Sequence, residues 1–125
     1  MKIMPKEYIQ KKMYILPELK ILKVDENGNS LSGAKFQIYN DNECKSAVED
    51  VGNLNLVTNN EGIISIRLNP RKYYVKEIEA PDGYQLNNEC TEVELKANER
   101  TVLTEINKLK RNRNIKNRIK NIKKK

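Results

Sequence analysis

The stretch Tyr73–Tyr84, which reads YYVKEIEAPDGY, does most to decide how this chain is expected to fold. Its first half alternates aromatic or β-branched residues with other residues, as a half-buried strand does, and Pro81-Asp82-Gly83 supplies the residues of a tight turn. Glu77 stands inside that strand, although a carboxylate is a poor strand residue and is costly to bury alone. Glu77 therefore either faces water or points inward and needs a partner.

Similar short segments recur along the chain, and turn residues separate each from the next. The expected strands are 19–24, 34–39, 54–58, 63–68, 73–79, 91–95 and 101–106. Between the second and third lies a polar loop, 40–53, in which we expect a short helix around Ser46–Val51. Seven short strands with regularly spaced turns predict an all-β, seven-stranded Greek-key sandwich of the immunoglobulin-like kind.

The composition narrows the classes of function. The chain has 125 residues, enough for one domain with tails, and it contains no histidine. Without histidine the usual catalytic triads and most metal sites are excluded, so we expect no metal and no cofactor. Glu77 and Glu79 are two positions apart, but two strand carboxylates alone are a weak argument for a glycosidase. We therefore do not expect an enzyme.

The positive charge is concentrated at the C-terminus. Nine of the 24 Lys and Arg lie in residues 109–125, which leaves 15 against 17 Asp and Glu in the rest of the chain. The isoleucines Ile115, Ile119 and Ile122 share one helical face, so this tail is expected either as a basic amphipathic helix or as a disordered, solvated segment. The helical form would suit an anionic membrane or nucleic acid.

Two cysteines, Cys44 and Cys90, stand far apart in the sequence and form no Cys-x-x-Cys motif. This spacing argues against a zinc or thioredoxin-like site. A disulfide between them and two unpaired thiols both remain open, because the choice depends on whether the chain is exported.

Four motifs, in order, resemble the Cna-B/SpaA family of Gram-positive surface-protein domains. They are LKVDENG with LSGAKFQIY in residues 22–39, TNNEG with LNP in residues 58–70, the YYVKEIEAPDGY stretch, and INK at 106–108. The resemblance covers residues 19–108 and implies a prealbumin-like β-sandwich. It also implies an intramolecular isopeptide bond between Lys23 and Asn107, formed with the help of Glu77.

The chemistry that this resemblance implies is physically coherent. Burial in an apolar core favours the neutral amine of Lys23, which is the nucleophilic form, and the protonated carboxyl of Glu77. Glu77 is then expected to polarise the Asn107 carbonyl and to pass a proton to the leaving ammonia. Such a reaction is a single-turnover self-modification and not enzymatic turnover.

Strand parity supports one of the two linked residues better than the other. Lys23 shares a face with Leu19 and Ile21, whereas Lys20 lies on the opposite face. Asn107 shares its face with Glu105, a poor core residue where the family usually has an apolar one. If Glu105 faces away from the core, regular alternation turns Asn107 away as well. A β-bulge near Glu105, which would shift the alternation, is therefore expected if Asn107 is to face the core.

The sequence thus predicts a polar lead-in (1–17), a Cna-B-like sandwich (18–108) and a basic tail (109–125). We expect a structural or adhesive module of a bacterial cell-surface protein, a pilin-like or adhesin-stalk domain. Its expected partners are neighbouring domains of a larger surface protein and host extracellular-matrix proteins. The alternative is an intracellular or phage-type protein that binds nucleic acid or anionic membrane through 109–125. No signal peptide or sorting motif is apparent in this chain, so a fragment, a diverged relative and a cytoplasmic protein all stay open.

Overall fold

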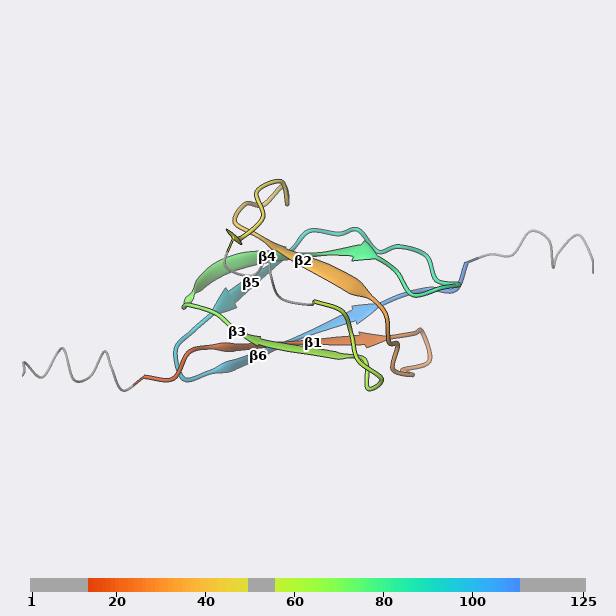
Figure 1. Cartoon of the computed structure of the whole chain (residues 1–125), viewed down its shortest axis with the longest axis horizontal. Coiled ribbons are helices and arrows are strands. Elements are labelled where there is room, and N and C mark those ends of the chain that lie inside the picture. The colour runs from red at the N-terminus through yellow and green to blue at the C-terminus, as the bar shows by residue number, and fades with distance from the viewer. Residues whose placement is uncertain (1–13, 50–55, 111–125) are drawn as a thin grey trace, which may run out of the picture.

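Two small β-sheets face each other in the computed structural model, which describes residues 14–49 and 56–110 (Figure 1). The described residues form six strands, which are β1 (Glu18–Val24), β2 (Lys35–Tyr39), β3 (Ile63–Arg67), β4 (Arg71–Glu79), β5 (Thr91–Leu95) and β6 (Arg100–Ile106). One sheet has the order β3-β1-β6 and the other β2-β4-β5. The prediction of an all-β sandwich is confirmed.

The central strand of each sheet has a different kind of neighbour. In the first sheet β1 pairs antiparallel with β3 and parallel with β6, so that Glu18 lies opposite Arg100 and Val24 opposite Ile106. In the second sheet β4 pairs antiparallel with both β2 and β5. The first and last strands of the domain therefore lie side by side and run in the same direction.

Period-2 alternation explains which side chains fill the space between the sheets. Leu19 and Ile21 of β1 are buried, as are Tyr73 and Val75 of β4, while the residues between them are more exposed. Phe36 and Ile38 of β2 point the same way and complete the centre of the core. This apolar cluster is what holds the two sheets together.

The inward rows of three strands change from apolar to polar at their C-terminal ends. Strands β1, β4 and β6 all run toward the same end of the sandwich (Figure 1). Along these rows Leu19 and Ile21 are followed by Lys23, Val75 is followed by Glu77, and the row of β6 ends in Asn107. Three polar side chains are thereby gathered at one end of the core.

Two expected elements differ in the structure. The described part of the expected strand 54–58 makes only one isolated bridge, between Val57 and Lys35, so six strands and not seven are formed by the described residues. Within the helix expected around Ser46–Val51, Ala47 instead forms a bridge with Tyr39, whereas Glu49 has a 3₁₀-helical conformation and the residues after it lie outside the described residues. Asp41 accepts backbone N–H bonds from Lys45 and Ser46, and it thereby holds residues 41–46 in a turn.

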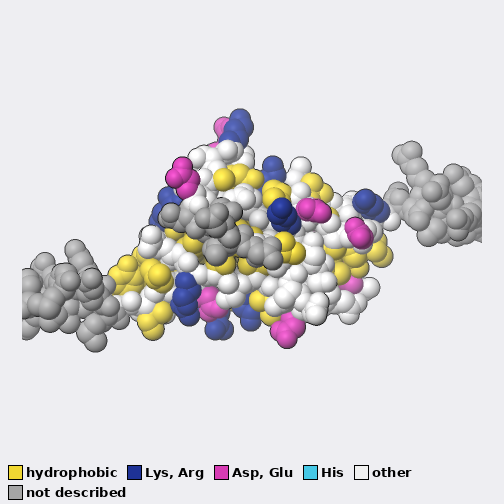
Figure 2. All heavy atoms as spheres, in the orientation of Figure 1, with side chains coloured by type: hydrophobic (Ala, Val, Ile, Leu, Met, Phe, Trp, Pro, Cys, Tyr) yellow, Lys and Arg dark blue, Asp and Glu magenta, His cyan; other side chains and the backbone are white. Residues whose placement is uncertain are grey.

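The described chain enters the sandwich at one end, before β1, and leaves at the other, after β6 (Figure 1). Basic and acidic side chains of the described residues are interspersed over the face seen in Figure 2, and they form no large patch of one sign on that face. The lead-in up to residue 13 and the tail beyond residue 110, including its three isoleucines, lie outside the described residues.

Candidate functional site

Lys23, Glu77 and Asn107 form a buried polar cluster at the end of the core. Their exposed fractions are 0%, 1% and 0%. Lysine, glutamate and asparagine are rarely buried this completely unless they are paired, so their presence together requires an explanation beyond packing.

The carboxylate of Glu77 contacts both of the other residues. The Lys23 Nζ lies 3.0 Å from Glu77 Oε2, and the Asn107 Nδ2 donates to Glu77 Oε1 at 2.9 Å. The amine of β1 and the amide that follows β6 are therefore held on the two oxygens of one carboxylate from β4. The structure thus brings together the three residues that the sequence singled out.

Several polar atoms of the cluster lack a hydrogen bond. Although Lys23 Nζ and Glu77 Oε2 are within ion-pair distance, neither atom has a hydrogen-bond partner among the described residues, and nor does Asn107 Oδ1. Unsatisfied buried groups destabilise a fold, and a buried ammonium does so more than a neutral group. A neutral amide in place of the ammonium would relieve this cost.

The amide of Asn107 is turned differently from the expectation. The sequence suggested that Glu77 would donate to the carbonyl oxygen of Asn107, whereas the structure directs the Nδ2 of Asn107 to Glu77. The same Nδ2 also donates to the Gln85 carbonyl oxygen at 3.0 Å. Because both partners are acceptors, they fix the amide with its nitrogen, the leaving group of the expected reaction, against the carboxylate.

An aromatic ring forms the apolar wall beside the amine. Lys23 Nζ lies 5.5 Å from the centroid of the Phe36 ring, and Phe36 lies opposite Glu77 in the β2–β4 register. The ring excludes water from the Lys23–Glu77 pair and offers its face to the cation. Phe36 belongs to the LSGAKFQIY motif, so this motif contributes directly to the site.

A short segment covers the cluster from outside, and we call residues 83–87 the strap. Its residue Gly83 accepts from Lys110 N–H, and Gln85 N–H donates to the Lys108 carbonyl oxygen at 2.7 Å. Gln85 and Asn87 of the strap bond directly to Asn107 and Glu77. The sequence did not identify these two residues, because their role depends on how the strap pairs with 108–110.

Glu105 faces the interior, and no β-bulge is needed to turn Asn107 inward. It is 8% exposed, and the one register shift that the described strands contain lies between Lys35 and Phe36 of β2. Burial raises the pKa of the Glu105 carboxyl, and the nearby charge of Lys23 partly opposes this rise. The row Leu103, Glu105, Asn107 therefore points inward as a regular strand, and the predicted bulge near Glu105 is wrong.

The two cysteines meet away from this cluster. Cys44 and Cys90 are joined as a disulfide with their Cα atoms 5.9 Å apart, so the loop after β2 is tied to the residue before β5. Glu79, the second carboxylate of the weak glycosidase argument, is exposed and does not share the site with Glu77.

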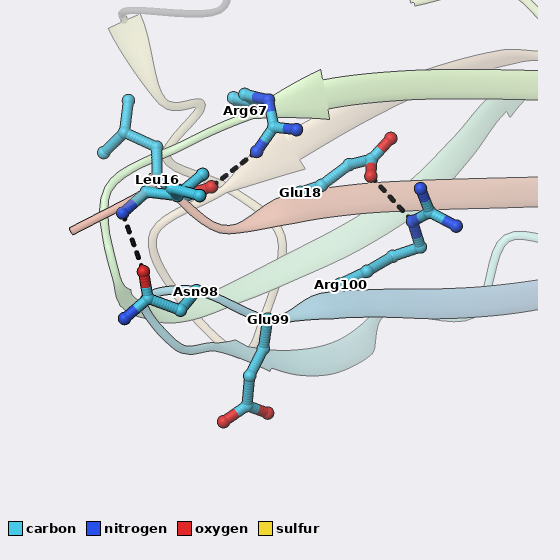
Figure 3. Close-up of a pocket in the computed structure, with 7 residues that line it drawn as sticks. Leu16, Glu18, Arg67, Asn98, Glu99 and Arg100 are labelled. Atoms are coloured by element: carbon cyan, nitrogen blue, oxygen red, sulfur yellow. Dashed lines mark hydrogen bonds and ion pairs between the residues drawn. The ribbon is translucent and has the colours of Figure 1, made fainter.

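A groove lies at the opposite end, where the chain enters the sandwich (Figure 3). Its polar groups already bond to one another. Arg67 donates to the Leu16 carbonyl oxygen at 2.7 Å, and Arg100 donates to Glu18 at 2.7 Å, while the side chain of Glu99 points away from the groove. These contacts anchor the segment before β1, and we assign the groove a structural role.

Within the described ranges, no group of three or more His, Cys, Asp or Glu side chains is arranged to hold a metal ion. Among the same residues, we find no helix with the length and apolar character needed to cross a membrane.

The fold and the buried Lys–Glu–Asn cluster define a prealbumin-like β-sandwich domain. The profile of the SpaA family, described as a prealbumin-like fold domain, matches residues 17–110. The chain belongs to this family. Among curated proteins, none matches the chain.

Solved structures of Gram-positive proteins resemble it. The Bacillus anthracis TIE protein is 33% identical with a TM-score of 0.63, over 76% of this chain and 17% of that protein. The minor pilin of Streptococcus agalactiae is 27% identical with a TM-score of 0.65, over 79% of this chain and 47% of that one. The major pilin BcpA of Bacillus cereus is 26% identical with a TM-score of 0.63, over 77% and 31%. The chain thus spans less than half the length of each of these proteins.

Proposed function

We propose that this chain is a load-bearing structural domain of a Gram-positive surface protein, of pilin-like or adhesin-stalk type. We further propose that it cross-links itself between Lys23 and Asn107. The observation that carries the proposal is that one buried carboxylate, that of Glu77, contacts both the amine of Lys23 and the amide nitrogen of Asn107. Membership of the SpaA family and likeness to pilins support the structural role.

The reaction needs only the three residues of the cluster. The Lys23 ammonium gives a proton to Glu77 Oε2, and the neutral Nζ attacks Cγ of Asn107. The Nζ–Cγ bond forms and the Cγ–Nδ2 bond breaks, with Glu77 supplying a proton to the departing nitrogen and taking one from the attacking nitrogen. The products are an amide, ammonia and a protonated Glu77, so atoms and charge balance.

Proximity supplies most of the acceleration that such a reaction needs. An amine does not attack an unactivated amide in water at a useful rate, but two groups held in contact react as if they were extremely concentrated. The Phe36 ring and the strap keep water out, which strengthens the interactions of Glu77 with the reacting groups.

The topology suits a domain under tension. The chain enters before β1 and leaves after β6, at opposite ends of two neighbouring parallel strands. A bond from Lys23 to Asn107 would join the end of β1 to the residue after β6. Force would then pass along β1 and through the bond, and would bypass everything between them.

The proposed location is the cell surface, and the proposed partners are other domains of a larger protein. The likeness to surface pilins and the Cys44–Cys90 disulfide, which suits an oxidising compartment, both support this. Binding to host extracellular-matrix proteins remains a prediction, as does the binding of nucleic acid or membrane by residues 109–125.

An intact mass of the purified chain tests the cross-link. Wild type should be lighter than its sequence mass by one ammonia, and Glu77→Ala should have the full sequence mass. Glu79→Ala is the matched control, because Glu79 is an exposed carboxylate on the same strand, and it should lose ammonia as wild type does. A wild-type chain of full mass would refute the cross-link.

A further inference from the structure

Asn87 of the strap contacts the reactive carboxylate with its main chain. Its backbone N–H donates to Glu77 Oε1 at 2.9 Å, the same oxygen that accepts from Asn107 Nδ2. These two donors leave Oε2 as the oxygen directed at Lys23. The orientation of the Glu77 carboxylate therefore depends on where Asn87 is held.

The side chain of Asn87 is in turn held by β6. Its Nδ2 lies 3.3 Å from Glu105 Oε2 and 3.4 Å from the Ile106 carbonyl oxygen, and donates to both. The other oxygen of Glu105 accepts from Thr91 Oγ1 at 3.4 Å. Glu105 thus ties the strap to β6 and β5 at once.

Glu105 has no place in the proposed reaction, yet it is a buried carboxylate beside it. It lies opposite Lys23 in the β1–β6 register and is two residues before Asn107 on the same inward row. An ionisable side chain at such a position is costly unless its hydrogen bonds contribute something that an apolar residue would not. Its bond to Asn87 is the contact that reaches the site.

We propose that Asn87 is a positioning residue of the cross-linking site and that Glu105 is the acceptor that holds it in place. This inference rests on the proposed function, since it concerns the rate of the Lys23–Asn107 reaction. Asn87 does not touch the reacting amine or amide. It fixes one oxygen of Glu77 on the leaving group, so that the other stays on the nucleophile.

The physical reason for an effect on rate is geometric. A glutamate side chain has several rotatable bonds, and a small rotation of the carboxylate would move one of its oxygens off its partner. Loss of an anchoring hydrogen bond of ordinary strength changes a rate by about tenfold. The hydrogen bonds that Asn87 Nδ2 donates to Glu105 and Ile106 are long, at 3.3 Å and 3.4 Å, so no larger effect is expected from either Asn87 or Glu105.

The experiment follows the reaction from its start. Full-length chain that has never folded, made by chemical synthesis, is diluted into folding buffer, and samples are quenched in acid and weighed by intact-mass spectrometry. Asn87→Ala keeps the backbone N–H but removes the anchor, and should slow ammonia loss about tenfold. Glu105→Leu should slow it by a similar factor, and Glu105→Gln, which keeps an acceptor oxygen, should regain most of that loss.

The double variant Asn87→Ala/Glu105→Leu separates positioning from general damage. If the two residues act as one unit, the double variant is no slower than the slower single variant. Glu79→Ala serves as the control for a surface substitution. Circular dichroism, recorded once the chain has folded and before most of the ammonia is lost, should show the same β-sheet content in every variant.

Three results would overturn the inference. They are an unchanged rate in Asn87→Ala, a Glu105→Gln variant as slow as Glu105→Leu, and additive losses in the double variant. If wild type itself loses no ammonia, the proposed cross-link fails and this inference fails with it. If wild type loses ammonia and Asn87→Ala loses it at the same rate, only the positioning role of Asn87 is refuted.

Discussion

Lys23 and Glu77 form an ion pair, 3.0 Å between Nζ and Oε2, in which both side chains are completely shielded from solvent. The two residues come from different sheets, β1 and β4, so the pair spans the sandwich. Desolvation of two charges offsets much of their attraction, and such a pair is weak evidence for stability. The proposed cross-linking reaction, which consumes both charges, would give this pair a role other than stability.

The Lys23–Glu77 pair should be costly to break and nearly neutral to replace. In a background of Asn107→Ala, which cannot form the bond, Glu77→Leu leaves an unpaired buried ammonium and should lower the free energy of unfolding by about 3–5 kcal/mol. The double change Lys23→Met with Glu77→Leu should recover most of this loss. Urea unfolding measures the free energy of unfolding of Asn107→Ala by itself, with Glu77→Leu added, and with both Lys23→Met and Glu77→Leu added. If the last protein is as unstable as the one with Glu77→Leu alone, the expectation is contradicted.

Stretching single molecules should reveal the path of force. Cross-linked wild type, pulled from its two ends, should show no lengthening from the segment between residues 23 and 107. Glu77→Ala should lengthen on unfolding by roughly 130 Å, because the Cys44–Cys90 disulfide prevents the residues between its two cysteines from extending, and by roughly 300 Å once a reductant opens that disulfide. Force spectroscopy on the chain fused in tandem to a marker domain makes the measurement. Equal lengthening in both proteins would show that the ends of β1 and β6 are not joined.

Gly62 should tolerate no side chain, because it lies against the main chain of Lys23. A Cβ at this position would be 2.6 Å from the Lys23 carbonyl oxygen, and the backbone φ is +75°. Gly62→Ala should therefore lower the free energy of unfolding by about 2–4 kcal/mol through strain and overlap together. Gly28 is the matched control, since its φ is +87° but nothing lies within 4 Å, and Gly28→Ala should cost only about 1 kcal/mol. If thermal unfolding shows the same loss of stability in Gly62→Ala and Gly28→Ala, the close approach of Gly62 to Lys23 does not contribute to that loss.

Glu105 should make stability fall as pH rises. Burial raises the pKa of its carboxyl above the ordinary value of 4.5; Lys23 opposes the rise, and Glu77 and Glu89 add to it. The stabilisation by protonated Glu105 is complete below the unfolded-state pKa and is lost as pH rises through the folded-state pKa. Glu105→Gln cannot ionise, so its stability relative to wild type should increase from pH 4.5 upward. Parallel stability profiles for the two proteins would contradict this.

Much of the fold could be predicted because its strands follow a simple physical rule. In β1 and β4 the residues alternate between the core and the surface, and Lys23 and Glu77 fall on the buried side of that alternation. The parity of β6 was also correct, and the error lay in treating Glu105 as unable to face inward. Glu105 is satisfied there by Asn87 and Thr91, which are distant in sequence.

The rest of the site could not be predicted, because it depends on contacts between loops. The strap bonds to 108–110 through backbone groups, which no side-chain pattern encodes. The direction of the Asn107 amide follows from two acceptors, Glu77 and Gln85, and only one of them was recognised. At Ser46, where a helix was expected to begin, the local hydrogen bonds of Asp41 form a turn instead.

Digestion of the folded, purified protein with a protease, followed by peptide sequencing by tandem mass spectrometry, shows whether Lys23 and Asn107 are covalently joined. We expect one branched peptide in which the side chain of Lys23 is bonded to Cγ of Asn107, present in wild type and absent from Glu77→Ala. Recovery of linear peptides with an unmodified Lys23 and an intact Asn107 amide from wild type would contradict it.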